Sequence, residues 1–233
     1  VGVITDGSAV LGLGNVGSLA GKPVMEGKGV LFKHFADIDV FDIEVNAEHP
    51  QEFIETVMRI APTFGGINLE DIAAPHCFEI EQALIEQLDI PVFHDDQHGT
   101  AIIIAAGLLN ALELQGKTLD EAKIVVLGAG AAGIAIANIL LDWGATRLIL
   151  CDSQGIVWPD RAGINTFKQE VARRAAPDSR RGDLPEALKD ADVFVGVSAP
   201  NLLDAQTVGT MAKDPMIFAM ANPDPEILPD EAR

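Results

Sequence analysis

Residues 94–100, which read His-Asp-Asp-Gln-His-Gly-Thr, carry the densest set of side chains that could do chemistry. They follow a short apolar run at residues 90–93 and open a long apolar segment. A second acidic pair, Glu70-Asp71, also ends a short apolar run. Carboxylates are costly beside an apolar core unless a cation or hydrogen bonds satisfy them. Two acidic strand ends therefore predict a cation site, and we assign the two histidines to turn or capping hydrogen bonds.

The four acids Glu70, Asp71, Asp95 and Asp96 are expected to meet, because the carboxyl ends of parallel strands share one edge of a sheet. An all-oxygen ligand set without cysteine suits Mg²⁺ or Mn²⁺ better than a structural zinc ion. Helix capping stays open as an alternative, since Asp71 and Asp96 each precede a predicted helix.

A glycine pattern typical of dinucleotide binding lies downstream. The residues that form it are Gly128, Ala129, Gly130, Ala131, Ala132 and Gly133. Gly128 permits a tight turn, Gly130 lets the backbone approach a pyrophosphate, and Gly133 lets helix and strand pack closely. An apolar strand precedes the pattern and a helix follows it, so the pyrophosphate would rest on a helix N-terminus. Without these flanking elements the pattern would indicate only a glycine-rich turn.

Two further residues are candidates for cofactor contacts. Asp152 ends the next predicted strand, about 20 residues beyond Gly133, and would accept the ribose hydroxyls. No basic residue follows within residues 153–155, which favours NAD, although distant basic residues could still receive the 2′-phosphate of NADP. Asn222 follows the last predicted strand and could bind cofactor ribose or substrate carboxylate, or serve as a turn residue before proline.

Lys28 is the candidate general base. It lies between two glycines beside an apolar run, so we expect it to be partly buried. Desolvation would lower its pKa and suit it to accept a proton. Lys22 and Lys33 compete for the role, and a surface lysine is the plain alternative for each of the three.

Composition narrows the functional class. The chain has 233 residues, with 16 Lys and Arg against 35 Asp and Glu, for a net charge of −19. This balance argues against nucleic acid and anionic membrane surfaces as partners. Cys77 and Cys151 lack metal-ligand spacing and fit a reducing cytoplasm. No signal peptide is recognised, and the apolar window at residues 124–141 contains three glycines and suits strand, turn and helix better than a membrane span.

Strand and helix patterns alternate along the chain, which predicts α/β units with largely parallel sheets. Strands are expected at residues 1–5, 40–45, 67–69, 92–93, 123–127, 147–151, 193–197 and 216–219. Helices are expected at residues 16–35, broken near Lys22-Pro23, and at 50–60, 77–88, 100–114, 131–143 and 166–175, with a helical turn at 184–188. The pattern of the helix at 77–88 turns Glu81 outward, and the helix at 100–114 is apolar enough to be buried.

A domain boundary is predicted at residues 115–117, where a glycine ends a helix and a new unit starts. Residues 1–115 would form a small domain with a parallel sheet that binds substrate and metal. Residues 116–233 would form a Rossmann-type dinucleotide-binding domain.

These motifs together resemble the malic enzymes, especially their shorter bacterial type. The carrying segments are TDG (5–7), VLGLGNVG (10–17), PVMEGKGVLFK (23–33), NLEDI (68–72), FHDDQHGTA (93–101), LGAGAAG (127–133) and AMANPDPEI (219–227). The resemblance implies oxidative decarboxylation of L-malate to pyruvate and CO₂, with reduction of NAD or NADP and a requirement for Mg²⁺ or Mn²⁺. It implies a malic domain followed by a nucleotide domain.

The resemblance also implies roles for residues. Glu70, Asp71 and Asp96 would be the metal ligands, with Asp95 beside them orienting the site and Lys28 as general base. Cofactor contacts would fall on residues 129–132 and on Asn222. The family is usually dimeric or larger, so a homo-oligomer is expected.

One departure from the family pattern is plain: the chain has no tyrosine. In the family a tyrosine upstream of Val1 protonates C3, and the nucleotide domain continues past Arg233. We therefore expect either the core of a longer enzyme, whose first domain lacks its N-terminal part and whose second is truncated at its C-terminus, or an enzyme whose last step is crippled. Another two-domain NAD-dependent dehydrogenase and a catalytically incomplete nucleotide-binding fragment remain as alternatives.

Overall fold

The computed structural model describes residues 1–175 and 181–233 and divides the chain into two compact units, Val1–Asp96 and Gln97–Arg233. The division falls near the start of α4 (Asp95–Gln115) rather than at residues 115–117. Within the second unit, a Cβ added to Gly107 of α4 would lie 3.3 Å from the ring of Phe218, so α4 packs closely there. The assignment of roles to residues 1–115 and 116–233 stays a prediction.

The first unit is built on a four-stranded sheet in the order β2-β1-β3-β4, with every neighbouring pair parallel. Its strands are β1 (Gly2–Thr5), β2 (Phe41–Glu44), β3 (Ile67–Leu69) and β4 (Val92–His94). The central pair, β1 and β3, has short apolar runs that are buried along their whole length. The carboxyl ends of all four strands therefore meet at one edge, as the sequence predicts.

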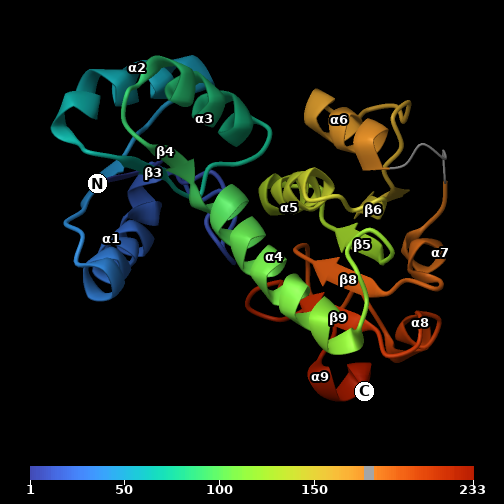
Figure 1. The fold of residues 1–233 in the computed structure, drawn as a ribbon. Helices are drawn as coiled ribbons and strands as arrows, with labels where there is room; N and C mark the ends of the chain where they lie inside the picture. The colour runs from blue at the N-terminus through green and yellow to red at the C-terminus, as the bar shows by residue number, and fades with distance from the viewer. Residues whose placement is uncertain (176–180) are drawn as a thin grey trace. The chain divides into compact units, whose positions relative to one another are not determined.

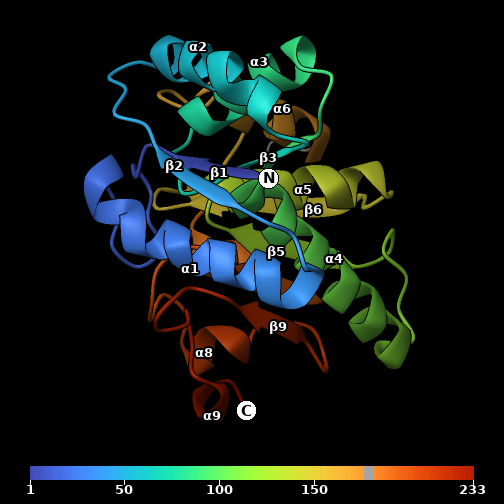
Figure 2. The same cartoon turned by 90° about the vertical axis from the view of Figure 1, so that its left-hand side faces the viewer.

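Helices cover both faces of this sheet (Figures 1 and 2). They are α1 (Ser18–Ala36), α2 (Pro50–Ile60), the 3₁₀ turn η1 (Ala61–Thr63) and α3 (His76–Gln87). The α1 helix lies on one face, and α2 and α3 lie side by side on the other. Proline at the first position of α2 suits a helix start, because its missing N–H has no partner there anyway.

The predicted break in α1 near Lys22-Pro23 is wrong, since the helix runs unbroken with Pro23 inside it. Its packing explains why. Met25 is fully buried, Gly21 lies close to the Cα of Gly7, and a Cβ at Gly29 would lie 3.4 Å from Val40. Burial of one continuous helix face outweighs the hydrogen bond that proline removes.

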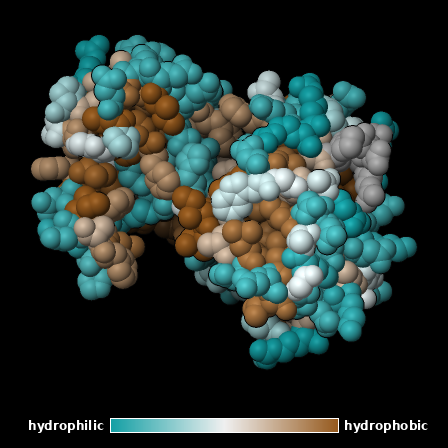
Figure 3. Space-filling view, in the orientation of Figure 1, coloured by the Kyte–Doolittle hydropathy of each residue, from teal (hydrophilic) through white to brown (hydrophobic). Residues whose placement is uncertain are grey.

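The α1 helix also leaves large apolar side chains in solvent. Those exposed by half or more are Leu19, Val30, Leu31 and Phe35. Apolar side chains are visible over this helix in Figure 3. A soluble monomer rarely exposes several large apolar side chains on one helix, so the exposed part of α1 is a candidate contact surface.

The second unit is built on a five-stranded sheet in the order β7-β6-β5-β8-β9. Its strands are β5 (Lys123–Leu127), β6 (Arg147–Asp152), β7 (Gly155–Ile156), β8 (Val193–Gly196) and β9 (Met216–Ala219). The pairs among β6, β5, β8 and β9 are parallel, whereas β7 is antiparallel to β6. The α/β fold class is confirmed, and the two-residue β7 was not predicted because it is too short to show periodicity.

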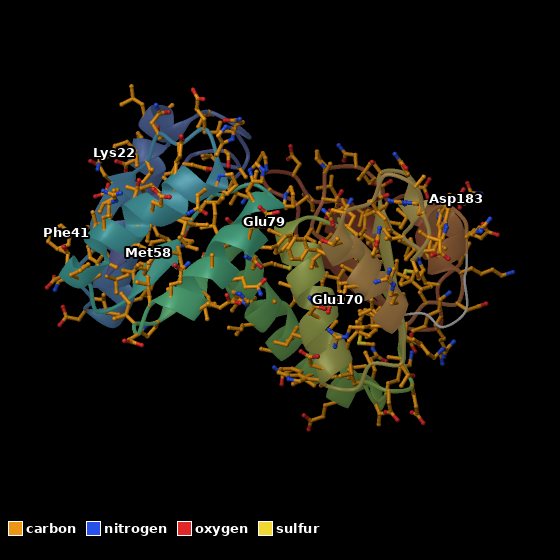
Figure 4. All side chains as sticks on the ribbon, turned by 90° about the horizontal axis from the view of Figure 1, so that it is seen from above. Lys22, Phe41, Met58, Glu79, Glu170 and Asp183 are labelled. Carbon is orange, nitrogen blue, oxygen red and sulfur yellow. The ribbon has the colours of Figure 1, made fainter. Side chains whose placement is uncertain are left out.

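Helices of this unit follow the predicted alternation. They are α5 (Ala131–Asp142), α6 (Thr166–Ala175), α7 (Leu184–Leu188), α8 (Ala205–Val208) and α9 (Pro229–Ala232). The α5 and α6 helices contact each other and β6, and α7 packs over β5, β6 and β7. Asp183, labelled in Figure 4, caps α7 by accepting a hydrogen bond of 3.0 Å from the Glu186 amide. The short helices α8 and α9 were not predicted.

The α4 helix differs from the prediction in its first residue and in how much of it is buried. It begins at Asp95 rather than Thr100, so the acidic pair forms its first turn. Ile104 and Leu108 are buried, but Ile102 and Ile103 are more than half exposed, which contradicts the expectation of a buried helix. Within the described ranges, no helix is long and apolar enough to cross a membrane.

Candidate active site

The α1 helix presents Lys28 on the face that packs against the sheet. Gly21, Met25 and Lys28 lie at i, i+4 and i+7, so they form one stripe along the helix. The first two are buried, and the Lys28 side chain is 20% exposed. Lys28 is thus partly buried, as predicted from its setting between glycines.

Lys28 Nζ reaches the acidic edge of the sheet. It donates to Glu70 Oε1 at 3.1 Å and also to Asp95 Oδ2. The competing lysines point elsewhere: Lys22, labelled in Figure 4, pairs with Asp42 at 2.6 Å, and Lys33 bonds to exposed carboxylates. Among these three lysines, only Lys28 contacts the predicted acidic pairs.

Three of the four predicted acids converge. One oxygen each of Glu70, Asp71 and Asp96 lies within 4.8 Å of the others, a spacing at which they could hold one metal ion. Asp71 Oδ2 is buried and has no hydrogen-bond partner among the described residues. A buried carboxylate oxygen without a hydrogen-bond partner, on a residue of an all-oxygen cluster, fits a hard divalent cation.

Burial raises the pKa of each carboxyl in this cluster. The pKa of Glu70 rises to about 7, chiefly through desolvation, against the attraction of Lys28. The pKa values of Asp71 and Asp96 rise to about 6, again first through desolvation and then through repulsion from the neighbouring acid. Such a cluster is electrostatically strained, and a bound cation would relieve it.

The pKa of Lys28 differs from its prediction. Desolvation lowers it, as expected, but the charges of Glu70 and Asp95 outweigh this effect and raise the pKa above 10.5. Residue spacing around Lys28 indicates burial but does not reveal the two carboxylates, which come from distant parts of the chain.

Backbone and side-chain hydrogen bonds fix the cluster. Asn68 Nδ2 donates to Glu70 Oε2 at 2.7 Å, and the Asp71 amide donates to Asp96 Oδ2 at 2.9 Å. The φ angle of Asp71 is +55°, in the left-handed region, where aspartate is one of the few tolerated side chains. These bonds and this turn set where the three carboxylates project, so the cluster does not depend on free side-chain rotation.

Glu81 of α3 lies beside the site, and the prediction that it faces solvent is wrong. It is only 6% exposed, and its Oε1 accepts a 2.9 Å hydrogen bond from the His94 amide. His94 is itself fully buried, with Nε2 3.7 Å from Asp96 Oδ2. Helical periodicity marked Glu81 as polar and therefore outward, and gave no signal for the strand end that it contacts.

The glycine turn of the second unit has the packing expected of a dinucleotide site. A Cβ on Gly133 would lie 1.7 Å from Gly128 O, and one on Gly128 would lie 2.5 Å from Val197 O. A Cβ on Gly130, in contrast, would meet no described atom within 4 Å. Gly128 and Gly133 are therefore required for packing, whereas Gly130 leaves room beside the N-terminus of α5, where an anion would be favoured.

Asp152 lies at the end of β6, as predicted, but two cations contact it. Arg161 donates to Asp152 Oδ2, and Lys168 Nζ donates to the same oxygen at 3.1 Å. Desolvation opposes the charge of Asp152, but these bonds and one from the Gln154 amide hold its pKa below 3.8. Basic residues distant in sequence are thus beside the predicted ribose-binding acid.

Asn222 is exposed and lies three residues beyond β9, at the carboxyl edge of the second sheet. Its contacts with a cofactor stay a prediction, as do those of residues 128–133.

Family models match both units. The malic enzyme N-terminal domain matches residues 1–85, and the malic enzyme NAD-binding domain matches residues 97–232. The chain belongs to the malic enzyme family.

Curated relatives align with the full length of this chain. The chain is 57% identical to an NADP-dependent malic enzyme of Halomonas elongata and 55% identical to a bifunctional malic/malolactic enzyme of Bacillus subtilis, and each alignment covers all of this chain. The chain covers 55% of the Halomonas protein and 57% of the Bacillus protein, so it spans about half the length of the curated relatives it matches.

The solved NAD-dependent malic enzyme of Thermotoga maritima is similar in structure, with a TM-score of 0.97 and 49% identity. The match covers all of this chain and 62% of that one. The malic enzyme fold predicted from the motifs is thus confirmed for both units.

Proposed function

We propose that this chain carries the catalytic core for oxidative decarboxylation of L-malate to pyruvate and CO₂ with reduction of NAD or NADP. The observation that carries the proposal is the contact of Lys28 with Glu70 and Asp95, beside the cluster formed by Glu70, Asp71 and Asp96. An amine held by carboxylates at one sheet edge supplies a positioned base of the kind that can deprotonate a 2-hydroxy acid.

The metal ligands in this proposal are Glu70, Asp71 and Asp96, supported by their spacing and by the orphaned oxygen of Asp71. All-oxygen donors favour Mg²⁺ or Mn²⁺. When bound, the ion would supply a Lewis acid for the 2-hydroxy acid and positive charge that offsets the carboxylates.

Lys28 would accept the proton of the C2 hydroxyl as hydride passes from C2 to the nicotinamide. An amine must be neutral to do so, and Glu70 and Asp95 favour its charged form. A divalent cation bound to Glu70, Asp71 and Asp96 would offset their negative charge and weaken that preference. Lys28 would therefore act as a base only when the cation is bound. Asp95, whose Oδ2 accepts from Nζ, holds the amine in place and can take its proton onward.

The product of oxidation, oxaloacetate, would then lose CO₂ to give the enolate of pyruvate, which needs a proton at C3. The family resemblance assigns that proton to a tyrosine, and this sequence has none. We therefore propose that full turnover requires residues of the longer relatives that this chain does not span.

The proposal includes both NAD and NADP as cofactors. The sequence favoured NAD because a lone carboxylate repels the 2′-phosphate of NADP. Arg161 and Lys168 offset the charge of Asp152, which removes most of that objection and supports acceptance of NADP as well. Relatives named for either cofactor are similar to this chain.

A homo-oligomer, dimeric or larger, is part of the proposal and is supported by the exposed apolar side chains of α1. A cytoplasmic setting is likewise proposed, supported by two cysteines that are free and buried.

The test is spectrophotometric: nicotinamide reduction with L-malate and Mn²⁺, for NAD and NADP separately, with EDTA as control. The chain itself is compared with a version extended to the length of its relatives. EDTA-sensitive reduction by either version supports the proposal. Cofactor and Mn²⁺ binding without reduction in both versions would overturn it and leave a nucleotide-binding function.

A further inference from the structure

Glu226 is a fully buried carboxylate in the segment that follows β9. Its Oε1 accepts a 2.9 Å hydrogen bond from the Ser198 amide, and its Oε2 accepts a 3.1 Å hydrogen bond from the Ala221 amide. Ser198 lies just beyond β8, and Ala221 lies just beyond β9. One side chain therefore joins the backbones of two loops that leave neighbouring parallel strands.

Main-chain hydrogen bonds also join the segment of Glu226 to the loop after β8. Glu226 O accepts from the Leu203 amide at 3.0 Å, and Pro225 O accepts from the Asn201 amide at 3.1 Å. The loop after β8 is thus fastened to the segment of Glu226 at both of its ends, while the side chain of Glu226 bridges to the start of the loop after β9.

The end of β8 leaves no room for a side chain beside the Glu226 carboxylate. A Cβ on Gly196, the last residue of β8, would lie 2.3 Å from the Glu226 carboxyl carbon. The same loop also borders the glycine turn, since a Cβ on Gly128 would lie 3.3 Å from Ser198 Cβ. The loop that Glu226 holds therefore starts beside the end of β5, at the predicted dinucleotide site.

A buried carboxylate is costly and is tolerated only when its oxygens are satisfied. In a doubly wound sheet a dinucleotide lies across the carboxyl ends of the strands, with its two halves on opposite sides of the switch point. The glycine turn and Asp152 belong to β5 and β6, so the loops after β8 and β9 face the nicotinamide half. We propose that Glu226 is a positioning residue that orders the backbone at Ser198 and Ala221 to receive that half.

This inference rests on the proposed dinucleotide binding, and its chemistry suggests the decisive variant. Both oxygens of a carboxylate accept, whereas a glutamine of equal size has only one accepting oxygen. In Glu226→Gln, an NH₂ group would face one backbone N–H, and one of the two loops would lose its acceptor.

The experiment measures calorimetric binding of two ligands to the unmutated chain, to Glu226→Gln and to the exposed control Glu231→Gln. One ligand is the reduced dinucleotide that the unmutated chain binds more tightly, and the other is the matching ADP-ribose, which lacks nicotinamide. For Glu226→Gln we expect about tenfold weaker dinucleotide binding and ADP-ribose binding within about twofold of normal. Equal weakening of both ligands, or no weakening of either, would overturn the inference.

A second variant and a measurement without mutation keep the test decisive if Glu226→Gln does not fold. Gly196→Ala should displace the carboxylate and cause the same selective loss. In the unmutated chain, the amides of Ser198 and Ala221 should exchange hydrogen as slowly as strand amides, and fast exchange at both would overturn the inference. If the unmutated chain binds neither ligand, the proposed cofactor function fails, whatever the state of Glu226.

Discussion

Lys28 Nζ lies 3.1 Å from Glu70 Oε1, although 42 residues separate the two in sequence. The amine comes from the buried stripe of α1 and the carboxylate from the end of β3. This contact joins the predicted base to the predicted metal cluster, so each should influence the other.

Replacement of Lys28 by methionine should strongly slow malate oxidation while metal binding persists. A positioned base contributes about 10²- to 10⁴-fold, so a rate loss of this size is expected in the version that turns over malate. Initial rates of nicotinamide reduction with saturating Mn²⁺ would measure it. Lys33→Met is the matched control, because Lys33 pairs with the exposed carboxylates of Asp37 and Asp39. Comparable losses in both variants would refute the assignment of the base.

Asp96→Asn should weaken Mn²⁺ binding by about 100-fold or more, beyond the 10- to 100-fold typical of residues that only support a ligand. The carboxylate supplies charge and an oxygen to a cluster of three, and asparagine keeps the shape without the charge. Electron paramagnetic resonance titration of free Mn²⁺ would give the dissociation constant. Asp42→Asn, in the same unit but paired with Lys22, should change it little. An unchanged constant for Asp96→Asn would rule out the proposed ligand set.

Gly133→Ala and Gly130→Ala should separate packing from ligand binding. The added Cβ of Gly133→Ala would overlap Gly128 O, and we expect a loss of about 3 kcal/mol of stability or more. Gly130 has an extended backbone and open space at its Cβ, so Gly130→Ala should fold normally yet bind cofactor weakly. Thermal melts and cofactor titration of both variants test the contrast. Normal cofactor binding by Gly130→Ala would contradict the placement of the pyrophosphate.

Lys168→Gln should weaken NADP binding by about tenfold and leave NAD binding nearly unchanged. Lys168 contacts the predicted ribose-binding acid and would lose a charge-assisted hydrogen bond to a 2′-phosphate. Binding of both cofactors at two salt concentrations checks the electrostatic origin, since the effect should shrink in high salt. Lys213→Gln, a change at an exposed site, is the control. Equal effects on the two cofactors would place Lys168 outside the 2′ site.

Asp152→Asn should destabilise the protein in a pH-dependent way. The pKa of Asp152 is held below 3.8, so its ion pairs stabilise the folded state fully only well above that pH, and this stabilisation is lost as pH falls through the folded pKa. Asparagine would leave Arg161 buried without its carboxylate, at a cost of about 3 kcal/mol near neutral pH. Urea unfolding of both proteins from pH 7 to pH 3 should show a difference that narrows only at the acid end. A difference that grows on acidification would contradict this account.

Local patterns in the sequence were enough to predict most elements of the fold. Apolar runs marked the strands at residues 67–69 and 123–127, and proline and glycine marked the start of α2 and the turn before α5. These signals are local, because strand and helix periodicity and turn chemistry involve residues close in sequence. Since parallel strands share a carboxyl edge, the convergence of Glu70, Asp71 and Asp96 could also be predicted.

Contacts between distant segments were decided only in the tertiary structure. Packing of α1 on the sheet kept the helix unbroken at Pro23 and selected Lys28, rather than Lys22 or Lys33, to meet the acids. The same kind of contact raised the pKa of Lys28, buried Glu81 and Glu226 against backbone amides, and placed Arg161 and Lys168 on Asp152. Electrostatic shifts and buried hydrogen bonds depend on distances in space, and spacing along the chain does not contain them.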